Sequence, residues 1–298
     1  MSMGISISII IVNYNSGEFL RDCINSLFPS PIEMEVIVVD NASSDGSLNT
    51  IDAMPQVTII PNDKNLGFST GCNIGIKASS ANYLLFLNPD CTVSRDTIMQ
   101  LLDYLQAHDQ AGMVGGLLVY PDGTEQGGGR RSIPTPWRTL VRALGLTRFS
   151  NRWPNLFTDF HLHKQPLPTE PVEVEAISGA CMLIKRKALD DVGLWDEGYF
   201  LHCEDLDYCM RFRKNGWKIM FLPQAKVVHE HGACSKSRPF FVEWHKHKGM
   251  LRFYRKFFRQ QYPHVLWCGV VFGVWFRFVV VSSYHLVKLT LAKTGLTK

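Results

Sequence analysis

The sequence predicts an α/β fold built around a mostly parallel central sheet. Two observations in residues 1–120 predict it: strand-like segments alternate with helix-like segments, and the strand-like segments are apolar throughout. Strands that are apolar on both faces are typical of a parallel sheet covered by helices on both sides. Ligands bind such sheets beyond the carboxyl ends of the strands, so the residues after each strand are candidates for a site.

Each element of this half has its own pattern. Continuous apolar runs such as EVIVVD and YLLFL predict strands at 5–13, 35–40, 57–61, 83–87 and 112–120. Helical periodicity predicts helices at 16–28, 43–54, 69–79 and 97–108, and either Ser43 or Ser44 suits the N-cap of the second.

The second half of the chain is less regular. Glycines and prolines between residues 121 and 171 predict a long mobile loop with a short helix. Strands are expected at 172–186, 218–222 and 225–229, and a basic helix at 238–259. The tail from residue 265 is strongly apolar.

Composition excludes several classes of protein. The N-terminal apolar run is short and has no basic region before it, so it predicts a first strand and not a signal peptide. The eight cysteines form no CxxC pair, which predicts buried thiols in a reducing compartment and disfavours a zinc site. There is no GxGxxG after the first strand and no P-loop sequence, so dinucleotide and P-loop folds are disfavoured.

Charge is unevenly distributed along the chain. The whole sequence has a net charge of +4, but residues 210–259 hold 13 Lys and Arg against 2 acids, a net +11. The remainder is therefore net acidic, at −7. A basic block of this kind predicts an anionic partner: phosphates, acidic lipid or nucleic acid.

Polar residues follow the first four strands. The segments are VNYN at 12–15, DNASSDGS at 40–47, NDKNLGFS at 62–69 and NPD at 88–90. An acid after the second strand can accept hydrogen bonds from a base or ribose, and Asp90 offers a hard oxygen ligand to a metal beside a diphosphate. Asn, Asp and Ser are equally typical of turns and caps, but four polar strand ends together favour a nucleotide site.

Residues 202–212, HCEDLDYCMRF, place three carboxylates at the start of a short helix. Acids in a first turn favour the helix dipole, so a solvated cap is one interpretation. The other is that one of them is a base beside a substrate.

Seven segments occur in an order and at distances that resemble one known family. They are IIIVNYN, VIVVDNASSDGS, NLGFSTGCNIGI, YLLFLNPD, ISGACMLIKR, GLWDEGYFLHCEDLDYCMR and VVHEHGACS, and they extend over roughly residues 5–259. Together they resemble the inverting glycosyltransferases of family 2, and within it the bacterial rhamnosyltransferase-like branch. The resemblance implies a GT-A fold, in which a Rossmann-like nucleotide-binding half is continuous with an acceptor-binding half.

The resemblance also implies roles for individual residues. Asp205 would be the catalytic base and Glu204 would orient acceptor hydroxyls, while Asp90 and His229 would lie at a Mg²⁺ or Mn²⁺ ion on the diphosphate. Asn88 stands where the family's DxD motif has its first acid, and a neutral amide holds a dication less strongly. The implied nucleotide-sugar-binding residues are Val12, Asn13, Tyr14, Asp40, Asn65, Gly67, Asn73 and Asn88.

The neighbouring residues leave alternatives open. Asp207 is expected to make a local pair or a solvated cap, and His231 is a weaker metal candidate than His229. Trp195 lines an acceptor pocket or is a buried aromatic. Arg130 and Arg131 either clamp phosphate or sugar from a mobile loop or are solvated loop charges. The cysteines at 181, 203 and 209 are expected to be packing residues.

The apolar tail at 263–287 predicts membrane association. A spanning helix needs about 20 apolar residues, but Arg277 interrupts this one. An interfacial or re-entrant segment is therefore preferred, a true span is the second interpretation and a buried helical hairpin the third. The basic block before the tail fits acidic lipid at the cytoplasmic face of the inner membrane, with peripheral or monotopic attachment.

These observations lead to one functional hypothesis and three rivals. The hypothesis is transfer of a sugar, L-rhamnose from dTDP-L-rhamnose as the first donor to consider, to a lipid-linked saccharide in bacterial surface polysaccharide synthesis. The rivals are a UDP-hexose or UDP-galactofuranose donor, a non-catalytic sugar-nucleotide-binding relative, and a nucleic-acid binder, which lacks any recognised motif. The expected domains are 1–260, comprising a donor half (1–120) and an acceptor half (121–260), and a tail (261–298).

Overall fold

The computed structural model describes residues 7–30, 32–51, 54–230 and 238–293. Its strands are β1 (Ile7–Asn13), β2 (Met34–Asp40), β3 (Val57–Pro61), β4 (Tyr83–Leu87), β5 (Cys91–Val93), β6 (Ala111–Val119), β7 (Arg130–Arg131), β8 (Val172–Glu173), β9 (Ala176–Ile177), β10 (Cys181–Lys185) and β11 (Lys218–His229). Its α-helices are α1 (Glu18–Ser26), α2 (Phe68–Ala78), α3 (Arg95–Ala107), α4 (Pro136–Ala143), α5 (Pro154–Phe157), α6 (Arg186–Val192), α7 (Glu204–Lys214), α8 (Pro239–Phe258) and α9 (His264–Lys293).

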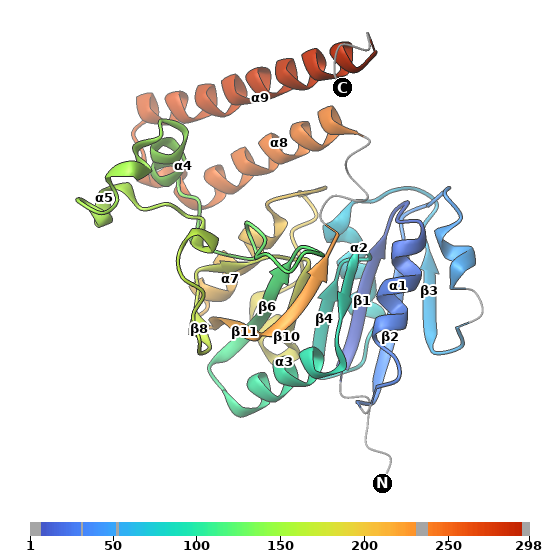
Figure 1. Ribbon diagram of the computed structural model, residues 1–298. Coiled ribbons are helices and arrows are strands. Elements are labelled where there is room, and N and C mark those ends of the chain that lie inside the picture. The colour runs from blue at the N-terminus through green and yellow to red at the C-terminus, as the bar shows by residue number, and fades with distance from the viewer. Residues whose placement is uncertain (1–6, 31, 52–53, 231–237, 294–298) are drawn as a thin grey trace.

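One sheet organises the molecule, in the order β3-β2-β1-β4-β10-β6-β11-β5, with β8 also paired to β11 (Figure 1). Strands β3, β2, β1 and β4 run parallel, as the sequence predicts. Strand β10 is antiparallel to both of its neighbours, β4 and β6, while β6 and β11 are parallel to each other. The four polar strand ends therefore meet at one edge of the sheet.

The sheet is covered on both faces. Along β1, Ile9 and Ile11 belong to one hydrophobic cluster and Ile10 and Val12 to the other, so the strand is buried on both sides. Helices α1 and α3 supply the first cluster, and α2, α7 and α8 supply the second. This double coverage explains why the strands lack polar alternation.

Four expected elements differ from the structure. In the described part of residues 43–54 the chain forms a short 3-10 turn at Ser47–Thr50, because the Asp45 carboxylate accepts hydrogen bonds from the backbone N–H groups of Gly17 and Ser47 and offers the chain an alternative to helix. The expected strand at 172–186 is three short strands. The two expected strands at 218–229 are one, with a register shift between Leu222 and Lys226 that accommodates Pro223.

Residues 121–171 contain more structure than one short helix. Helices α4 and α5 and the 3-10 turn Leu146–Phe149 between them form a small lobe beside the carboxyl-terminal end of α8 (Figure 1). The hydroxyls of Thr139 on α4 and Tyr254 on α8 are 2.7 Å apart and join the lobe to that helix.

The tail is a single long helix. Helices α8 and α9 lie side by side as a hairpin, with α9 on the side of α8 that faces away from the sheet (Figure 1). Among the described residues, α9 is the one helix long and apolar enough to cross a membrane, and none of its most apolar window is buried. The hairpin is therefore not the buried one that the sequence allowed as a third interpretation.

Candidate active site

The ends of β1 and β2 are joined by a buried polar network. The side-chain amide of Asn13 donates to Asp40 Oδ1 (2.7 Å) and to Ser47 Oγ (2.9 Å), and Asn13 is fully buried. The backbone N–H of Ser43 donates to the other carboxylate oxygen of Asp40 (2.9 Å). Asn13 therefore fixes the orientation of Asp40, a connection between two predicted site residues that their positions in the sequence do not reveal.

Two other residues of the first strand end lie close by. The side chain of Val12 packs against Gly71 of α2, where a Cβ would come within 2.6 Å of it. Tyr14 is half-buried, and its hydroxyl accepts a hydrogen bond from Arg238 (3.0 Å), whose guanidinium also lies over the tyrosine ring. One cation of the basic block at residues 210–259, Arg238, thus contacts the candidate donor site.

The turn after β3 contacts the loop that leads to the predicted base. Asn65 Oδ1 accepts the Gly67 N–H (2.9 Å), and Gly67 has a left-handed φ of +85°. A Cβ at Gly67 would be 2.6 Å from the Phe200 carbonyl oxygen, which accepts the next N–H along the chain, that of Phe68. Glycine is required here both by conformation and by close packing.

Asn73 lies on the buried face of α2. Its side-chain amide donates to the Trp195 carbonyl (3.0 Å) and to Glu197 (2.8 Å), and its side-chain oxygen accepts the Trp195 N–H (2.9 Å). These contacts hold the 195–197 loop against α2, so the part that Asn73 plays in the described chain is to position this loop.

Asp90 and His229 form a buried pair at the end of β4 and β11. Their nearest side-chain atoms, Oδ1 and Nε2, are 3.2 Å apart. Gln126 explains the geometry: its amide nitrogen donates to the His229 carbonyl (2.5 Å), which leaves its oxygen to accept the Nδ1 proton of His229 (2.8 Å). The Nε2 atom of His229 then faces Asp90 Oδ1, so the pair offers one nitrogen and one oxygen atom to a cation.

The residues around this pair fit a divalent metal with few protein ligands. The potential ligand atoms of Asp90, Cys91 and His229 lie within 4.8 Å of one another. Burial raises the pKa of the Cys91 thiol, which donates to the Ala180 carbonyl, so Cys91 is a packing residue and not a thiolate ligand. The remaining candidate ligands are the Asp90 carboxylate and the His229 imidazole, and Asn88 lies two residues before Asp90. Such a set suits Mg²⁺ or Mn²⁺, whose other ligands would be phosphate and water oxygens.

Asp205 begins the base side of the site. Its carboxylate is ion-paired with Arg131 of β7 and accepts the backbone N–H of Gly179 (3.4 Å). Burial alone would lower the pKa of the Arg131 guanidinium, but the Asp205 carboxylate beside it raises that pKa overall. Of the two arginines left open by the sequence, Arg131 is therefore held at the site. Arg130 is buried in an ion pair with Glu125 and is not a solvated loop charge.

Glu204 lies next to Asp205 and is nearly fully buried, at 9% exposure. Among the described residues, its Oε2 atom has no hydrogen-bond partner. Burial, together with the neighbouring Asp205 carboxylate, raises the pKa of Glu204 well above its usual value, which favours the neutral carboxyl.

The metal side and the base side are neighbours through residues 179–180. The Asn88 N–H donates to the Ala180 carbonyl (2.9 Å), and the preceding residue, Gly179, contacts Asp205. One backbone–backbone hydrogen bond and one backbone–side-chain hydrogen bond therefore connect the loop that carries Asp90 to the first turn of α7.

Backbone strain concentrates around these loops. Among the described residues, the non-glycine residues with positive φ are Asn15 (52°), Ala42 (59°), His202 (68°) and Cys203 (70°). The first pair follows β1 and β2, and the second pair immediately precedes the acids of α7. Such conformations cost about 1–3 kcal/mol each and are retained at functional sites by the surrounding structure.

Several neighbouring residues have roles in packing. Asp207 is fully buried and not a solvated cap: it pairs with Arg211 and with Lys256, both at 2.7 Å, which confirms the local pair but not the solvation. Trp195 is also buried, stacked on Tyr208, as the second interpretation had it. The cysteines at 181, 203 and 209 are buried too. His231 lies outside the described residues.

Sequence reasoning did not single out Gln126 or Phe200, and it did not pair Arg131 with the predicted base. Gln126 is 103 residues from His229, and Arg131 is 74 residues from Asp205. The one available signal was the GGGRR segment, whose glycines mark an irregular chain path near the site.

Known proteins resemble this chain in sequence. Residues 8–193 match the glycosyl transferase family 2. The N-acetylglucosaminyl-diphospho-decaprenol L-rhamnosyltransferase of Mycobacterium tuberculosis is 31% identical over 244 residues, which are 77% of this chain and 77% of that protein. Rhamnosyltransferase WbbL of Escherichia coli is 23% identical over 257 residues, 80% of this chain and 88% of the other.

Solved structures share the fold at low sequence identity. The mannosyltransferase PcManGT of Pyrobaculum calidifontis, in complex with GDP-Man and Mn²⁺, superposes with a TM-score of 0.58 at 14% identity, covering 98% of this chain and 81% of that one. GalNAc-T7 with UDP, GalNAc and Mn²⁺ gives a TM-score of 0.56 at 18% identity, covering 77% and 44%. The chain therefore has a GT-A fold and belongs to glycosyl transferase family 2.

Proposed function

We propose that this glycosyltransferase moves a sugar from a nucleoside diphosphate to a hydroxyl of a lipid-linked saccharide, with inversion at the anomeric carbon. The observation that carries the proposal is the short path from the Asp90–His229 pair, through residues 179–180, to Asp205. A diphosphate would bind at the Asp90–His229 end of this path, and the attacking hydroxyl would lie at the Asp205 end. L-Rhamnose from dTDP-L-rhamnose is the first donor to test, because two rhamnosyltransferases are among the relatives.

The donor half would bind the nucleotide at the strand ends. Asp40 would accept from the base, with Asn13 holding its carboxylate in place and Tyr14 beside it. The turn at 65–67 and Asn88 would line the sugar diphosphate, while Val12 and Asn73 would shape the pocket from β1 and α2. Donor half (1–120), acceptor half (121–260) and tail (261–298) remain the division that we propose.

Asp90 and His229 would hold Mg²⁺ or Mn²⁺ against the diphosphate. A divalent cation at this position supplies charge stabilisation to the leaving nucleoside diphosphate. Gln126 would keep the Nε2 atom of His229 directed at that position. Asn88, where the motif has its first acid, contributes a neutral oxygen and so leaves Asp90 as the one charged ligand that we assign to this motif.

Asp205 would remove the proton from the acceptor hydroxyl as the new bond forms. One base suffices for a single displacement, and such catalysis typically contributes about 10²–10⁴ in rate. The ion pair with Arg131 occupies the Oδ2 atom of Asp205, so the acceptor hydroxyl would approach the other oxygen, Oδ1. Glu204, protonated beside it, would donate a hydrogen bond to the acceptor.

The acceptor would be bound at a membrane surface. Helix α9 has the length and composition of a membrane helix, and residues 210–259 carry a net charge of +11 that suits anionic lipid. Attachment at the cytoplasmic face of the cell membrane, peripheral or monotopic, would place the site beside lipid-linked saccharides used for surface polysaccharides. Nucleic acid is not an expected partner.

Two alternatives remain within the family. A UDP-hexose or UDP-galactofuranose donor would use the same strand-end site. A non-catalytic sugar-nucleotide-binding relative is favoured by one observation, the amide of Asn88 in place of an acid.

A donor screen tests the proposal. The full chain is incubated with a lipid-linked saccharide, each candidate nucleotide sugar and Mg²⁺ or Mn²⁺, and the anomeric configuration of the product is determined by NMR. We expect transfer with inversion, a loss of about 10²–10⁴ in kcat for Asp205→Asn, and unchanged donor binding in that variant. Asp207→Glu is not a suitable control, because Asp207 is buried. Asp191→Asn is a suitable control, because Asp191 is exposed at the end of α6.

The outcomes separate the alternatives. Donor binding without turnover for any donor would favour the non-catalytic relative. Turnover in Asp205→Asn equal to that of the unchanged chain would remove Asp205 from the role of base. Retention of configuration would contradict the single displacement.

A further inference from the structure

The lobe formed by residues 136–157 exposes an apolar surface that the proposed chemistry does not use. Its 22 residues contain four arginines and no acid. Its large apolar side chains, each between 37% and 61% exposed, are Trp137, Leu140, Leu144, Phe149, Trp153 and Leu156. So many exposed large apolar side chains in so short a segment are typical of an interaction surface.

Two of the four arginines are already neutralised within the chain. Arg138 pairs with Glu175 (2.6 Å) and Arg142 pairs with Asp159 (2.7 Å). Arg148 and Arg152 have no carboxylate partner among the described residues, and each guanidinium lies over the ring of the next residue, Phe149 or Trp153. The tip of the lobe therefore presents two cations alternating with two aromatic rings.

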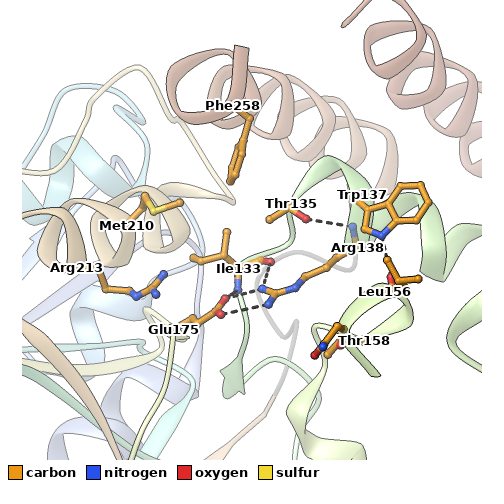
Figure 2. Close-up of a pocket in the computed structure, with 11 residues that line it drawn as sticks. Ile133, Thr135, Trp137, Arg138, Leu156, Thr158, Glu175, Met210, Arg213 and Phe258 are labelled. Carbon is orange, nitrogen blue, oxygen red and sulfur yellow. Dashed lines mark hydrogen bonds and ion pairs between the residues drawn. The ribbon is translucent and has the colours of Figure 1, made fainter. Parts of the chain in front are cut away.

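The lobe is fixed to the hairpin that carries the apolar tail. Beside the Thr139–Tyr254 contact, a cavity of about 330 Å³ is lined by Trp137 and Leu156 of the lobe, by Met210 of α7 and by Phe258 at the end of α8 (Figure 2). Helix α9 begins six residues after Phe258. The amino-terminal end of α9 and the lobe are thus held on the same side of the molecule (Figure 1).

The lobe lies at the membrane surface whether α9 crosses the membrane or lies in its interface. If α9 crosses a membrane, the end that follows α8 lies at the surface on the catalytic side, where the lobe is. If α9 lies in the interface, the lobe beside its amino-terminal end is at the same surface. Arginine and tryptophan are the side chains suited to that region, because each has an apolar body and a polar group that reaches the headgroups.

We infer that the 136–157 lobe is a second membrane-contact element, which docks on an anionic bilayer surface through its apolar side chains and through Arg148 and Arg152. The two unpaired cations favour anionic headgroups over zwitterionic ones. The inference rests on the proposed membrane location of α9 but not on sugar transfer. Its test therefore has a readout that is independent of activity.

Hydrogen exchange measured by mass spectrometry resolves the lobe from α9. The full chain is placed in detergent micelles, in phosphatidylcholine nanodiscs, and in nanodiscs that also contain phosphatidylglycerol. We expect slower exchange in the lobe only in the discs with phosphatidylglycerol. Arg148→Gln and Arg152→Gln should each reduce that protection roughly fivefold, since one basic residue near an anionic surface contributes about that factor.

Matched variants on α3 control for nonspecific effects. Arg95→Gln removes one exposed cation and Met99→Ala one exposed apolar side chain, both far from the lobe. Neither should change protection of the lobe, whereas Trp153→Ala should reduce it. Equal exchange in all three environments while α9 is protected, or equal protection in both kinds of disc, would overturn the inference whatever the enzyme's activity.

Discussion

The donor side and the base side of the site are held in different ways. On the donor side, Asn13 and Asp40 are the last residues of β1 and β2, and Asp90 lies in the turn between β4 and β5, so the backbone places them. On the base side, Asp205 is positioned by Arg131 and Gly179, which are remote in sequence and come from short, irregular segments. The comparison teaches that the proposed site draws one part from residues that the sheet places and the other part from residues that side-chain pairs hold.

This difference predicts which substitutions destabilise the fold and which lower only the activity. A polar residue at a strand end can be replaced without loss of the sheet beneath it. A residue that anchors α7 cannot, because Asp207 holds this helix through buried ion pairs with Arg211 and Lys256.

The largest expected effect is on the base side. Asp207→Asn leaves Arg211 and Lys256 without their buried carboxylate, and removal of one partner from such a pair costs about 3–5 kcal/mol. We expect the free energy of unfolding, measured by denaturant titration of the full chain, to fall by that amount. Asp103→Asn, on the exposed face of α3, serves as the control. A loss below about 1 kcal/mol, the typical value for an exposed pair, would contradict the comparison.

Asp90→Asn tests the donor side. The substitution removes a charged ligand, so the affinity for Mn²⁺ should fall at least about 100-fold, because even outer-sphere changes typically cost 10–100-fold. Stability should change little, since β4 and β5 still carry the turn. The dependence of donor turnover on Mn²⁺ concentration measures the effect, and Asn88→Asp, which adds an acid, should shift that dependence in the opposite direction. An unchanged midpoint for Asp90→Asn would remove Asp90 from the metal site.

Gln126→Leu tests the proposed metal site without replacing a residue that would bind the metal. Loss of the hydrogen bond to Nδ1 frees the His229 ring, and we expect metal affinity to fall about 10–100-fold. The Mn²⁺ titration again provides the measurement, and Gln110→Leu, at an exposed position, is the matched control. Equal affinity in Gln126→Leu and the unchanged chain would mean that Gln126 does not orient the ligand.

The smallest expected effect concerns Asp196, which joins the base-side loop to α8 through Arg252 and Lys256. Burial opposes ionisation, but hydrogen bonds from Lys256 and Arg252 lower the pKa of Asp196 to about 2. A depressed pKa means that the ion pairs stabilise the fold above the ordinary value of 3.8, and that this contribution is lost as pH falls toward 2.

Since these pairs are partly exposed, Asp196→Asn should cost about 1 kcal/mol at neutral pH. Unfolding curves at pH 7 and at about pH 2 measure the difference, which should be largely lost at the lower value, where the unchanged carboxyl is about half protonated in the folded state. A difference that stays constant across this range would show that the contacts of Asp196 do not depend on its charge.

The sequence predicted the donor half well because its signals are local. An apolar run followed by Asp40 or by residues 88–90 reports both a strand and the edge at which it ends. The one wrong element, the helix expected at 43–54, failed for a local reason as well: Asp45 competes for backbone N–H groups that helix formation needs.

The base half was less predictable because its contacts are distant. Nothing within a few residues of Arg131 indicates Asp205, and nothing near Gln126 indicates His229. The short strands at 172–185 follow from pairing with β7, β11 and the neighbours of β10, which periodicity cannot show. Family resemblance supplied Asp205, whereas its partners required the fold.

The position of β10 has a consequence for engineering. This strand comes from residues 181–185 but is inserted between β4 and β6, in the centre of the sheet. A chimera that joined the first 120 residues to the remainder of a relative would have to rebuild that centre from two parents. Sugar preference in this enzyme is therefore better changed by single substitutions than by exchange of a whole segment with a relative.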